Sequence, residues 1–459
     1  MDKRYDVAII GSGPAGYSAA LRLGMNNRSV CVIDFSQALL GGVCLNEGCI
    51  PVKSMLNTAK VYRQARQSED RGVTADVKDV DIKKAADFAS SASSRLRKGI
   101  KGLLDKYGVV FTEGRAELDG SSKLRISKDN GDIDGIEAES IIIATGSRPK
   151  GISGIEADGH LIMTSRDALR CNEVPRRLLV IGAGAIGIEF SSIFSAFGSE
   201  VTLVEAMPRL LPSVEEELSS ALGRIFKKRG INILTDAGVS VLHKGKQSVE
   251  AELKTCDSVK RQSFDAVLIA AGRIPNTDGL GLDRLGIKMT DGFIDVDEGM
   301  RTNIYNIFAA GDVLKTPMYA HTAYREAYIA SDSILGNVTK MACYKNTPLV
   351  VFSEPQIASA GLNESEARAL YGDVVVSRAF YKANGLAVAT NHEDGFIKVV
   401  FDKKERLLYG VHIIGEQATE MIHEYILAMN AGLKVDAIAD VIHAHPTYSE
   451  MASALFSVD

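Results

Sequence analysis

The 459 residues suffice for two to four domains, and 46% hydrophobic with 24% charged residues is typical of a globular protein in water. The formal net charge of -5 argues against nucleic acid or an anionic membrane as partner. Six cysteines in so long a chain are no secreted disulfide scaffold, and the apolar run after Tyr5 is too short for a signal peptide or membrane span. We therefore expect a cytoplasmic protein, in which a disulfide is more often catalytic than structural.

The chain opens on a nucleotide-binding pattern. Residues 6–10 are an apolar run typical of a buried parallel strand, and a Gly-x-Gly-x-x-Gly motif at 11–16 leads into an alanine-rich helical stretch. A second apolar run at 30–33 ends at Asp34. Strand, glycine turn, helix, strand and acid together predict a dinucleotide site, with the pyrophosphate at the helix N-terminus and the ribose at Asp34.

Two cysteines follow, in the stretch GGVCLNEGCIPVK at residues 41–53. On a straight helix five residues rise about 7.5 Å, whereas a disulfide needs Cα atoms within about 7 Å. If Cys44 and Cys49 bond, the backbone must bend, and the glycines around them permit a bend. The helical pattern after Pro51 places Cys49 near a helix start, which stabilises a thiolate. A zinc half-site or two unrelated thiols are the alternatives, although no second Cys or His pair lies nearby in the sequence.

The next segments connect this stretch to a second nucleotide-binding pattern. Residues 55–107 are predicted to be helical and polar, and residues 109–141 alternate in short segments with turns at 119–120 and 130–131, which predicts a small antiparallel sheet. Residues 141–146 are predicted to form a buried strand that runs into a turn.

The opening pattern then repeats. An apolar run at 178–181, a Gly-x-Gly-x-x-Gly motif at 182–187 and a run at 201–204 end at Glu205. The first glycine and the acid are equally far apart in both copies. A closing strand at 267–272 precedes Arg273-x-Pro275, which echoes Arg148-Pro149 after the first copy. The chain is therefore predicted to contain two dinucleotide-binding domains.

The last third combines a returning strand with a separate domain. Residues 306–312 are a buried run ending at Gly311-Asp312. From residue 348 onward, strands near 357–361, 395–401 and 408–414 are followed by helices, as in an α+β domain. The end of the chain carries His443-Ala-His445-Pro-Thr followed by Glu450. Other cysteines and histidines match no motif, and we interpret them as packing or surface residues: Cys31, Cys171, Cys256, Cys343, His160, His243 and His392.

The cysteine stretch resembles the redox-disulfide motif of the flavin-dependent pyridine nucleotide–disulfide oxidoreductases, and the resemblance covers nearly the whole chain. It implies an α/β fold with two Rossmann-like domains, the second inserted in the first, and a C-terminal α+β dimerisation domain. The bounds it implies are 1–148 and 274–345 for the FAD-binding domain, 149–273 for the NAD-binding domain and 346–459 for the dimerisation domain.

The resemblance also implies the roles of individual residues. It makes Cys44 and Cys49 the redox disulfide and His445 the base, with Glu450 behind it. The implied cofactor contacts are Gly11, Gly13, Gly16, Asp34, Lys53, Gly114, Gly146, Asp312 and Ala320, together with Gly182, Gly184, Gly187, Glu189, Glu205, Val239, Gly272 and Arg273. No metal site is implied.

Within the family, the C-terminal motif and Glu205 favour members that oxidise dihydrolipoyl groups with NAD⁺. In the implied reaction a dihydrolipoyl thiol, deprotonated by His445, attacks the disulfide. Cys44 takes the mixed disulfide, and Cys49 becomes the thiolate that faces FAD. The implied partners are a second copy of the chain and the lipoyl domains of a 2-oxo acid dehydrogenase or glycine cleavage complex.

Three residues depart from the family pattern: Asp34 stands where Glu is more common, Val52 where a small polar residue is common, and Glu47 where an apolar residue is usual. A carboxylate beside the cysteines disfavours a thiolate, so Glu47 bears on the redox potential. An NAD(P)H-dependent reductase of another disulfide and a non-catalytic flavoprotein stay open as alternatives.

Overall fold

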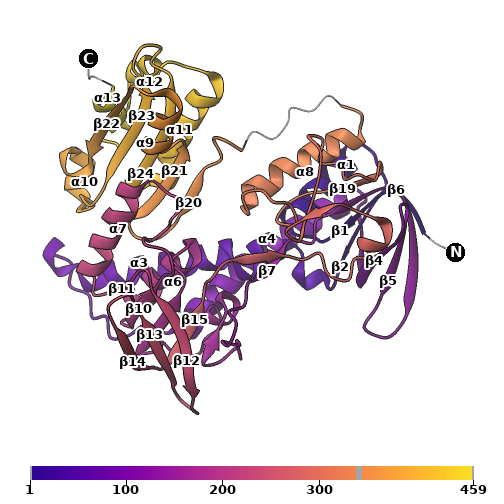
Figure 1. Ribbon diagram of the computed structural model, residues 1–459, viewed down its shortest axis with the longest axis horizontal. Coiled ribbons are helices and arrows are strands. Elements are labelled where there is room, and N and C mark those ends of the chain that lie inside the picture. The colour runs from indigo at the N-terminus through magenta and orange to yellow at the C-terminus, as the bar shows by residue number, and fades with distance from the viewer. Residues whose placement is uncertain (1–2, 338–343, 457–459) are drawn as a thin grey trace. The chain divides into compact units, whose positions relative to one another are not determined.

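Figure 1 shows the computed structural model, which describes residues 3–337 and 344–456. Cys343, which we interpret as a packing or surface residue, lies outside the described residues, as do residues 457–459. The chain divides into two compact units. The first consists of Met1–Ser54, Ala86–Lys150 and Arg273–Tyr344, and the second of Met55–Ala85, Gly151–Gly272 and Lys345–Asp459.

The first unit is built on one sheet with the strand order β3-β2-β1-β6-β5-β4, in which β19 also pairs with β6. The parallel strands are β1 (Lys3–Ile10), β2 (Val30–Asp34), β3 (Val110–Glu113) and β19 (Ile307–Ala309). β4 (Arg115–Gly120) and β5 (Lys123–Ser127) form the predicted antiparallel part. β6 (Ile133–Ile143) belongs to both parts, because it pairs antiparallel with β5 and parallel with β1. The sequence predicted two separate strand regions here, and the structure joins them in one strand.

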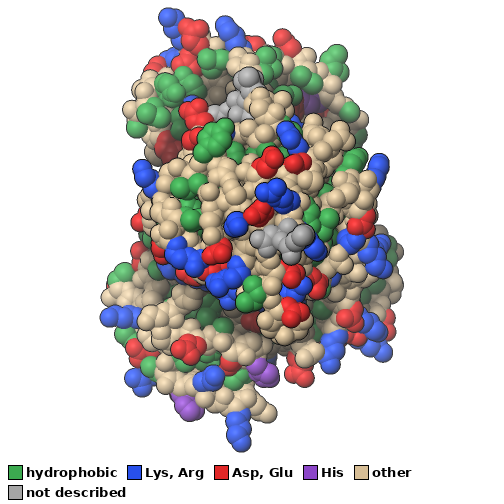
Figure 2. Space-filling model, turned by 90° about the vertical axis from the view of Figure 1, so that its right-hand side faces the viewer, with side chains coloured by type: hydrophobic (Ala, Val, Ile, Leu, Met, Phe, Trp, Pro, Cys, Tyr) green, Lys and Arg blue, Asp and Glu red, His purple; other side chains and the backbone are tan. Residues whose placement is uncertain are grey.

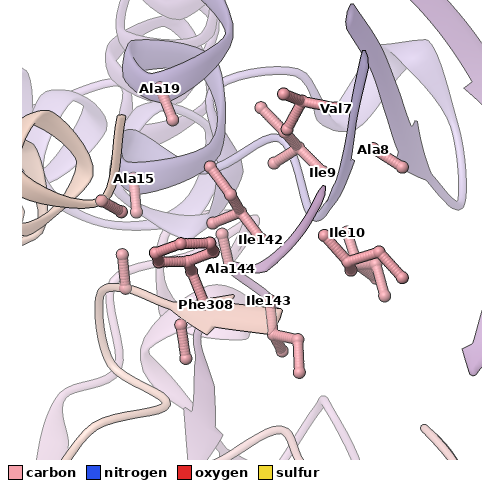
Figure 3. Packing of buried hydrophobic residues seen from close by; sticks show 14 of the residues in the cluster. Val7, Ala8, Ile9, Ile10, Ala15, Ala19, Ile142, Ile143, Ala144 and Phe308 are labelled. Atoms are coloured by element: carbon pink, nitrogen blue, oxygen red, sulfur yellow. The ribbon is translucent and has the colours of Figure 1, made fainter. Parts of the chain in front are cut away.

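The core of this unit lies between the sheet and helix α1 (Pro14–Met25). Figure 3 shows Phe308 of β19 and Ile142 of β6 lying beneath α1, on the side of Ala15. All three side chains are 5% exposed or less, as expected for a parallel sheet covered by helices. The returning strand predicted at residues 306–312 is thereby confirmed as a part of the first unit.

Several shorter elements complete the first unit. α8 (Ala320–Ile334) packs on α1, where Arg22 forms an ion pair with Asp332. β7 (Ser147–Pro149) pairs antiparallel with β16 (Arg273–Pro275), so the two similar Arg-Pro segments lie side by side where the chain leaves the unit and returns. The remaining elements are η1 (Gln37–Leu39), α2 (Gly42–Glu47), η3 (Asp283–Leu285), β17 (Met289–Thr290) and β18 (Phe293–Ile294).

Two helices contain residues of both units, and they account for the predicted helical region at 55–107. They are α3 (Cys49–Arg66) and α4 (Ile82–Lys106), with η2 (Glu69–Arg71) between them in sequence.

The second unit contains a parallel sheet with the order β11-β10-β9-β15-β8. Its strands are β8 (Ile162–Met163), β9 (Arg177–Ile181), β10 (Glu200–Val204), β11 (Asn232–Leu234) and β15 (Ala266–Ile269), and its helices are α5 (Ser165–Ala168), α6 (Ala185–Ala196) and α7 (Glu216–Lys228). A three-stranded antiparallel sheet adds β12 (Gly238–Lys244), β13 (Val249–Lys254) and β14 (Val259–Phe264). The predicted second nucleotide-binding fold is confirmed, since β9, β10 and the helix between them repeat β1, α1 and β2.

The C-terminal part of the second unit is an antiparallel sheet with the order β20-β21-β24-β23-β22, shown in orange to yellow in Figure 1. Its strands are β20 (Leu349–Val351), β21 (Gln356–Gly361), β22 (Val374–Phe380), β23 (Phe396–Asp402) and β24 (Leu408–Gly415). Its helices are α9 (Glu364–Tyr371), η4 (Tyr381–Ala383), α10 (Gly385–Thr390), α11 (Ala418–Ala431), α12 (Val435–Ala439), η5 (Ser449–Met451) and α13 (Ala452–Leu455). α11 packs on β21 and β24, which confirms the predicted α+β domain.

Candidate active site

The two glycine motifs form turns of nearly identical geometry. Gly11 has a φ of 102° and Gly182 a φ of 103°, in the left-handed region that favours glycine. A Cβ on Gly16 would lie 1.9 Å from the Gly11 carbonyl oxygen, and a Cβ on Gly187 would lie 1.9 Å from that of Gly182. Only glycine allows the helix to pack so closely on the turn, so both motifs fold as a dinucleotide-binding motif requires.

The first turn of each following helix can accept a phosphate group. α1 begins after Gly13 and α6 after Gly184, and no side chain caps either helix. Backbone N–H groups in a first helical turn have no partner within the helix, and the helix dipole favours a negative charge there. The residues present at both turns therefore fit the pyrophosphate of a dinucleotide.

The acid after each second strand is held beside its glycine turn by backbone hydrogen bonds. Asp34 accepts from the Ser12 N–H at 2.8 Å and from the Ser12 hydroxyl at 2.5 Å. Glu205, 9% exposed, accepts from the Ala183 N–H at 2.6 Å and the Met207 N–H at 2.9 Å. Both carboxylates thus lie where a ribose would meet the turn. The shorter Asp34 makes the same contact with its turn as Glu205 does, although Glu is more common at its position.

The cysteine stretch bends as the sequence predicted. Gly48, with φ of -143° and ψ of -114°, separates α2 from α3, and α3 begins at Cys49. Cys49 therefore occupies a first helical turn, where a thiolate is favoured. A Cβ on Gly42 would lie 2.6 Å from the Gly13 Cα, so the start of α2 packs against the first nucleotide-binding turn. This contact brings the cysteines to the first of the two nucleotide sites.

Cys44 and Cys49 are present as two thiols that are hydrogen-bonded to each other. That hydrogen bond, followed by burial, raises the pKa of Cys44, whereas the positive charge of Lys53 opposes the rise. The raised pKa of Cys44 fits the prediction that Cys49, and not Cys44, acts as the thiolate. The disulfide between them stays a prediction.

A chain of polar contacts lies around Asp312. The Ser147 hydroxyl donates to the Asp312 carboxylate at 2.5 Å, and Arg273 donates to that hydroxyl at 2.7 Å. Burial lowers the pKa of the Arg273 guanidinium, while the negative charge of Asp312 acts in the opposite direction. The negative charges of Cys49 and Glu47 also raise the pKa of Arg273, but less than Asp312 does. The positive charge of Arg273 therefore partly offsets the negative charge of Glu47. Sequence reasoning missed Ser147, and its place directly after Gly146 was the available signal.

The other predicted cofactor residues of the first unit gather at the carboxyl ends of its strands. Gly114 donates its N–H to the Asp34 carbonyl at 2.9 Å, and Gly146 follows β6 with a φ of 71°. Ala320 is the first residue of α8. These positions follow from the rule that ligands bind beyond the carboxyl ends of parallel strands.

In the second unit, Gly272 follows β15 with a φ of 104°, and Val239 lies in β12. Glu189 in α6 is 5% exposed and accepts from the Phe352 N–H at 3.0 Å. The family resemblance also implies that Lys53, in the first unit, pairs with Glu189, in the second, and this pairing stays a prediction.

The predicted base and its acid are in contact. His445 Nδ1 lies 2.9 Å from Glu450 Oε2, and the imidazole side chain is 78% exposed. Asn384 donates to the other Glu450 oxygen at 3.2 Å and holds the carboxylate in place. With Nδ1 engaged by a carboxylate, Nε2 is the atom that can take up a proton, as in the histidines of catalytic triads. His443 makes a separate contact with Glu424 at 3.0 Å.

No group of three or more His, Cys, Asp or Glu residues within 3–337 and 344–456 could hold a metal ion. None of the helices in the same ranges is long and apolar enough to cross a membrane.

Two dinucleotide turns, with a cysteine pair packed against the first and an α+β domain at the C-terminus, define a class of oxidoreductases that connect a redox-active thiol pair to two nucleotide cofactors. The chain belongs to the pyridine nucleotide–disulphide oxidoreductase family: the family profile matches residues 5–327, and the profile of its dimerisation domain matches residues 347–455. The chain is accordingly a flavin-dependent oxidoreductase that uses FAD and NAD(H), and it forms a homodimer.

Similar proteins span the full length of the chain. It is 38% identical to the dihydrolipoyl dehydrogenase of Zymomonas mobilis, over 98% of this chain and 97% of that one. It is also 38% identical to that of Bacillus subtilis, over 97% and 94%. Among solved structures, LpdA from Mycobacterium tuberculosis superposes with a TM-score of 0.91 at 25% identity, over 99% of this chain and 98% of that one. The HOCl-induced flavoprotein disulfide reductase RclA from Escherichia coli gives 0.88 at 29%, over 99% and 100%.

Proposed function

We propose that this enzyme oxidises dihydrolipoyl groups and reduces NAD⁺. The observation that carries the proposal is the hydrogen-bonded pair of Cys44 in α2 and Cys49 at the start of α3, with the start of α2 packed against the first nucleotide turn at Gly42. The relatives named dihydrolipoyl dehydrogenase are similar to this chain over nearly its full length. The first nucleotide turn would hold FAD, which when bound would supply the electron transfer between the reduced cysteines and NAD⁺.

The residues of this chain carry out the thiol chemistry. His445 takes a proton from one dihydrolipoyl thiol, because a thiol with a pKa near 8.5 is mostly protonated at neutral pH. The resulting thiolate attacks the Cys44 sulfur, the bond between Cys44 and Cys49 breaks, and Cys49 leaves as a thiolate. The second lipoyl thiol then attacks the first lipoyl sulfur, and its proton passes to the Cys44 sulfur as that sulfur is released. The lipoyl disulfide closes, Cys44 leaves as a thiol, and His445 keeps the first proton as an imidazolium.

The nucleotides are assigned by what surrounds each turn. FAD is proposed for the turn at Gly11, against which the cysteine helix packs, and NAD(H) for the turn at Gly182. The domain bounds proposed from the sequence, 1–148 with 274–345, 149–273 and 346–459, follow this assignment. Glu205 would face the 2′-phosphate of NADP(H), which supports NAD(H) as the natural nucleotide.

The base is proposed to act on the other subunit's cysteines. His445 lies in the dimerisation domain and its side chain is 78% exposed, as a residue offered to a second chain would be. A two-fold dimer would then contain two identical active sites, each with cysteines from one subunit and the base from the other. We propose cytoplasmic lipoyl domains of a 2-oxo acid dehydrogenase or glycine cleavage complex as the partners that supply substrate.

Steady-state turnover of dihydrolipoamide with NAD⁺ tests the proposal. We expect activity that is lost in both Cys49→Ser and His445→Ala, and little reduction of glutathione disulfide by NADPH. A wild-type protein that contains FAD yet does not turn over dihydrolipoamide would contradict the proposal.

The likeness to RclA favours a second candidate, the NAD(P)H-dependent reduction of another disulfide. Faster turnover of glutathione disulfide than of lipoamide, measured in the same assay, would support that candidate instead.

A further inference from the structure

Glu326 is a buried acid to which the proposed reaction gives no role. It lies in α8 and is 0% exposed. A carboxyl group buried to this degree is costly unless hydrogen bonds satisfy it. Here the Gly311 N–H donates to Oε2 at 2.7 Å, and the Tyr344 hydroxyl donates to Oε1 at 2.8 Å. Glu326 therefore connects α8, the turn at Gly311 and the residue that ends the first unit.

The Gly311 turn carries Asp312, a cofactor contact that the family resemblance implies; it lies in the first unit, which is proposed to bind FAD, and we propose that Asp312 contacts the flavin. Gly311 has a φ of 82°, and a Cβ on it would lie 3.3 Å from Ala15 of α1. The turn is therefore pressed against the helix that begins the first nucleotide site. Glu326 holds the Gly311 N–H on one side, and the Ser147 hydroxyl holds the Asp312 carboxylate on the other. The direction of the Asp312 side chain depends on both contacts.

The hydrogen bond from Tyr344, 18 residues further along the chain, helps to hold the Glu326 carboxyl group in place. Burial raises the pKa of Glu326, and the nearby charge of Asp312 acts in the same direction. Hydrogen bonds from Thr316, Tyr344 and the Gly311 N–H oppose that rise. Each of these donors gives its hydrogen to the carboxyl group, which favours the charged form of Glu326 and holds the carboxyl group in its present orientation.

We propose that Glu326 and Tyr344 are positioning residues for flavin binding: together they hold the Gly311–Asp312 turn so that the Asp312 carboxylate meets the ribityl chain of FAD. The inference rests on the proposed flavin contact at Asp312. It concerns the affinity for FAD, and it holds whichever disulfide the enzyme uses.

The test measures FAD binding to protein stripped of flavin, by quenching of flavin fluorescence, in five variants compared with the wild type. Glu326→Ala removes the acceptor of the Gly311 N–H, and we expect FAD affinity to fall on the order of 10- to 100-fold. Tyr344→Phe removes one hydroxyl, and we expect roughly a tenfold loss. Glu326→Gln should restore most of the affinity, because its amide oxygen can accept from Gly311 while its NH₂ donates to the Tyr344 oxygen.

The matched control is Ser331→Ala. Ser331 is 0% exposed in the same helix, but its hydroxyl donates to the Ala327 carbonyl of that helix at 2.7 Å. It should bind FAD as the wild type does, with a similar loss of thermal stability to that of Tyr344→Phe. If Tyr344→Phe and any soluble Glu326→Ala protein bind FAD no more weakly than Ser331→Ala, the positioning role is overturned.

Asp312→Asn separates this inference from the site on which it rests. Weakened FAD binding in Asp312→Asn, with wild-type binding in Tyr344→Phe, would contradict the positioning role alone. Wild-type binding in Asp312→Asn would contradict the proposed flavin contact itself. Should Glu326→Ala fail to fold, Tyr344→Phe and Glu326→Gln still decide the outcome, because neither removes side-chain volume from the core beyond one oxygen.

Discussion

At the scale of single residues, the two cysteines are chemically unequal. Cys44 lies within α2 and its pKa is raised by the hydrogen bond with Cys49 and by burial, whereas Cys49 begins α3. The start of α3 favours negative charge on Cys49, whereas the raised pKa of Cys44 disfavours negative charge there.

This inequality predicts opposite spectra for two variants. Two-electron reduction of the wild type should produce a long-wavelength absorption band from a thiolate beside the flavin. Cys49→Ser should lack the band. Cys44→Ser should show the band as purified, because without Cys44 the disulfide cannot form and Cys49 stays a thiolate. The measurement is anaerobic titration with NADH followed by visible spectroscopy. A band in Cys49→Ser would reverse the assignment.

We propose that Glu205 makes the enzyme prefer NAD(H) to NADP(H). Its carboxylate is fixed by the Ala183 and Met207 N–H groups, so it cannot easily turn away from a 2′-phosphate. Two like charges about 4 Å apart repel by roughly 4 kcal/mol at an effective dielectric of 20, an upper-end value. We expect kcat/KM for NADH to exceed that for NADPH by at least about tenfold. In Glu205→Gln, the ratio of these two kcat/KM values should be smaller. Equal values in the wild type would refute this role of Glu205.

At the scale of elements, the two glycine turns can be disabled one at a time. Gly16→Ala and Gly187→Ala each place a Cβ 1.9 Å from a backbone oxygen and must push the helix from its turn. We expect Gly16→Ala to be purified with little or no FAD. Gly187→Ala should retain FAD but bind NADH at least about tenfold more weakly, as measured by calorimetry.

Gly99→Ala is the matched control for both glycine variants. Gly99 lies inside α4, and a Cβ there would meet nothing within 4 Å. Alanine should therefore stabilise the helix by about 1 kcal/mol and leave both nucleotides bound. Loss of FAD in Gly187→Ala and its retention in Gly16→Ala would exchange the two cofactor assignments.

A buried ion cluster joins elements of the second unit. Lys398 of β23 is 1% exposed and contacts Glu215 at 2.9 Å, Glu217 at 2.6 Å and Glu364 at 2.8 Å. A hydrogen bond from Arg378 is the main cause that lowers the pKa of Glu217 to about 2, with Lys398 adding to it against the opposite effect of burial. Because the folded-state pKa lies below the unfolded one, this stability is present above about pH 4.5. It is lost as the pH falls toward 2.

Lys398→Met should destabilise the protein by about 3–5 kcal/mol at pH 7, since it removes the cation that pairs with the buried Glu215 carboxylate. The difference from the wild type should shrink below about pH 4.5, where the acids of the variant become protonated. Urea unfolding at several pH values measures both effects. A difference that stays constant from pH 7 to pH 3 would mean that the cluster contributes by packing alone.

The elements with strong local patterns were predictable from the sequence. Apolar runs that end at a glycine motif define β1 and β9, and the alternating segments define the antiparallel strands β4 and β5. The sequence did not show that β6 serves two kinds of pairing, because a change of partner along one strand leaves no change in residue pattern.

The candidate site was predictable where a motif marks it and not elsewhere. Cys44, Cys49 and His445 lie in motifs with distinctive spacing. Ser147, Glu326 and Tyr344 lie far apart in sequence, and each has a common side chain in ordinary surroundings. Only the fold brings their hydroxyl and carboxyl groups to the turn that carries Asp312.

At the scale of the whole molecule, the chain leaves the first unit after β7 and returns at β16, and these two strands pair with each other. A short exit and return at one place allows a second nucleotide fold to be inserted without disturbing the first sheet.

On the face that Figure 2 shows, basic and acidic side chains are interspersed, as the net charge of -5 suggests. The match to a dimerisation domain at residues 347–455 supports a homodimer.

The central claim is that the cysteine pair and the pair of His445 with Glu450 form one active site across the dimer. The most direct test mixes inactive Cys49→Ser subunits with inactive His445→Ala subunits under conditions in which subunits exchange. Each mixed dimer should then contain one intact site, and oxidation of dihydrolipoamide should recover toward about a quarter of the wild-type rate at equal mixing, because half of the dimers are mixed and each has one of its two sites. Verified exchange of subunits with no recovered activity would contradict the shared site.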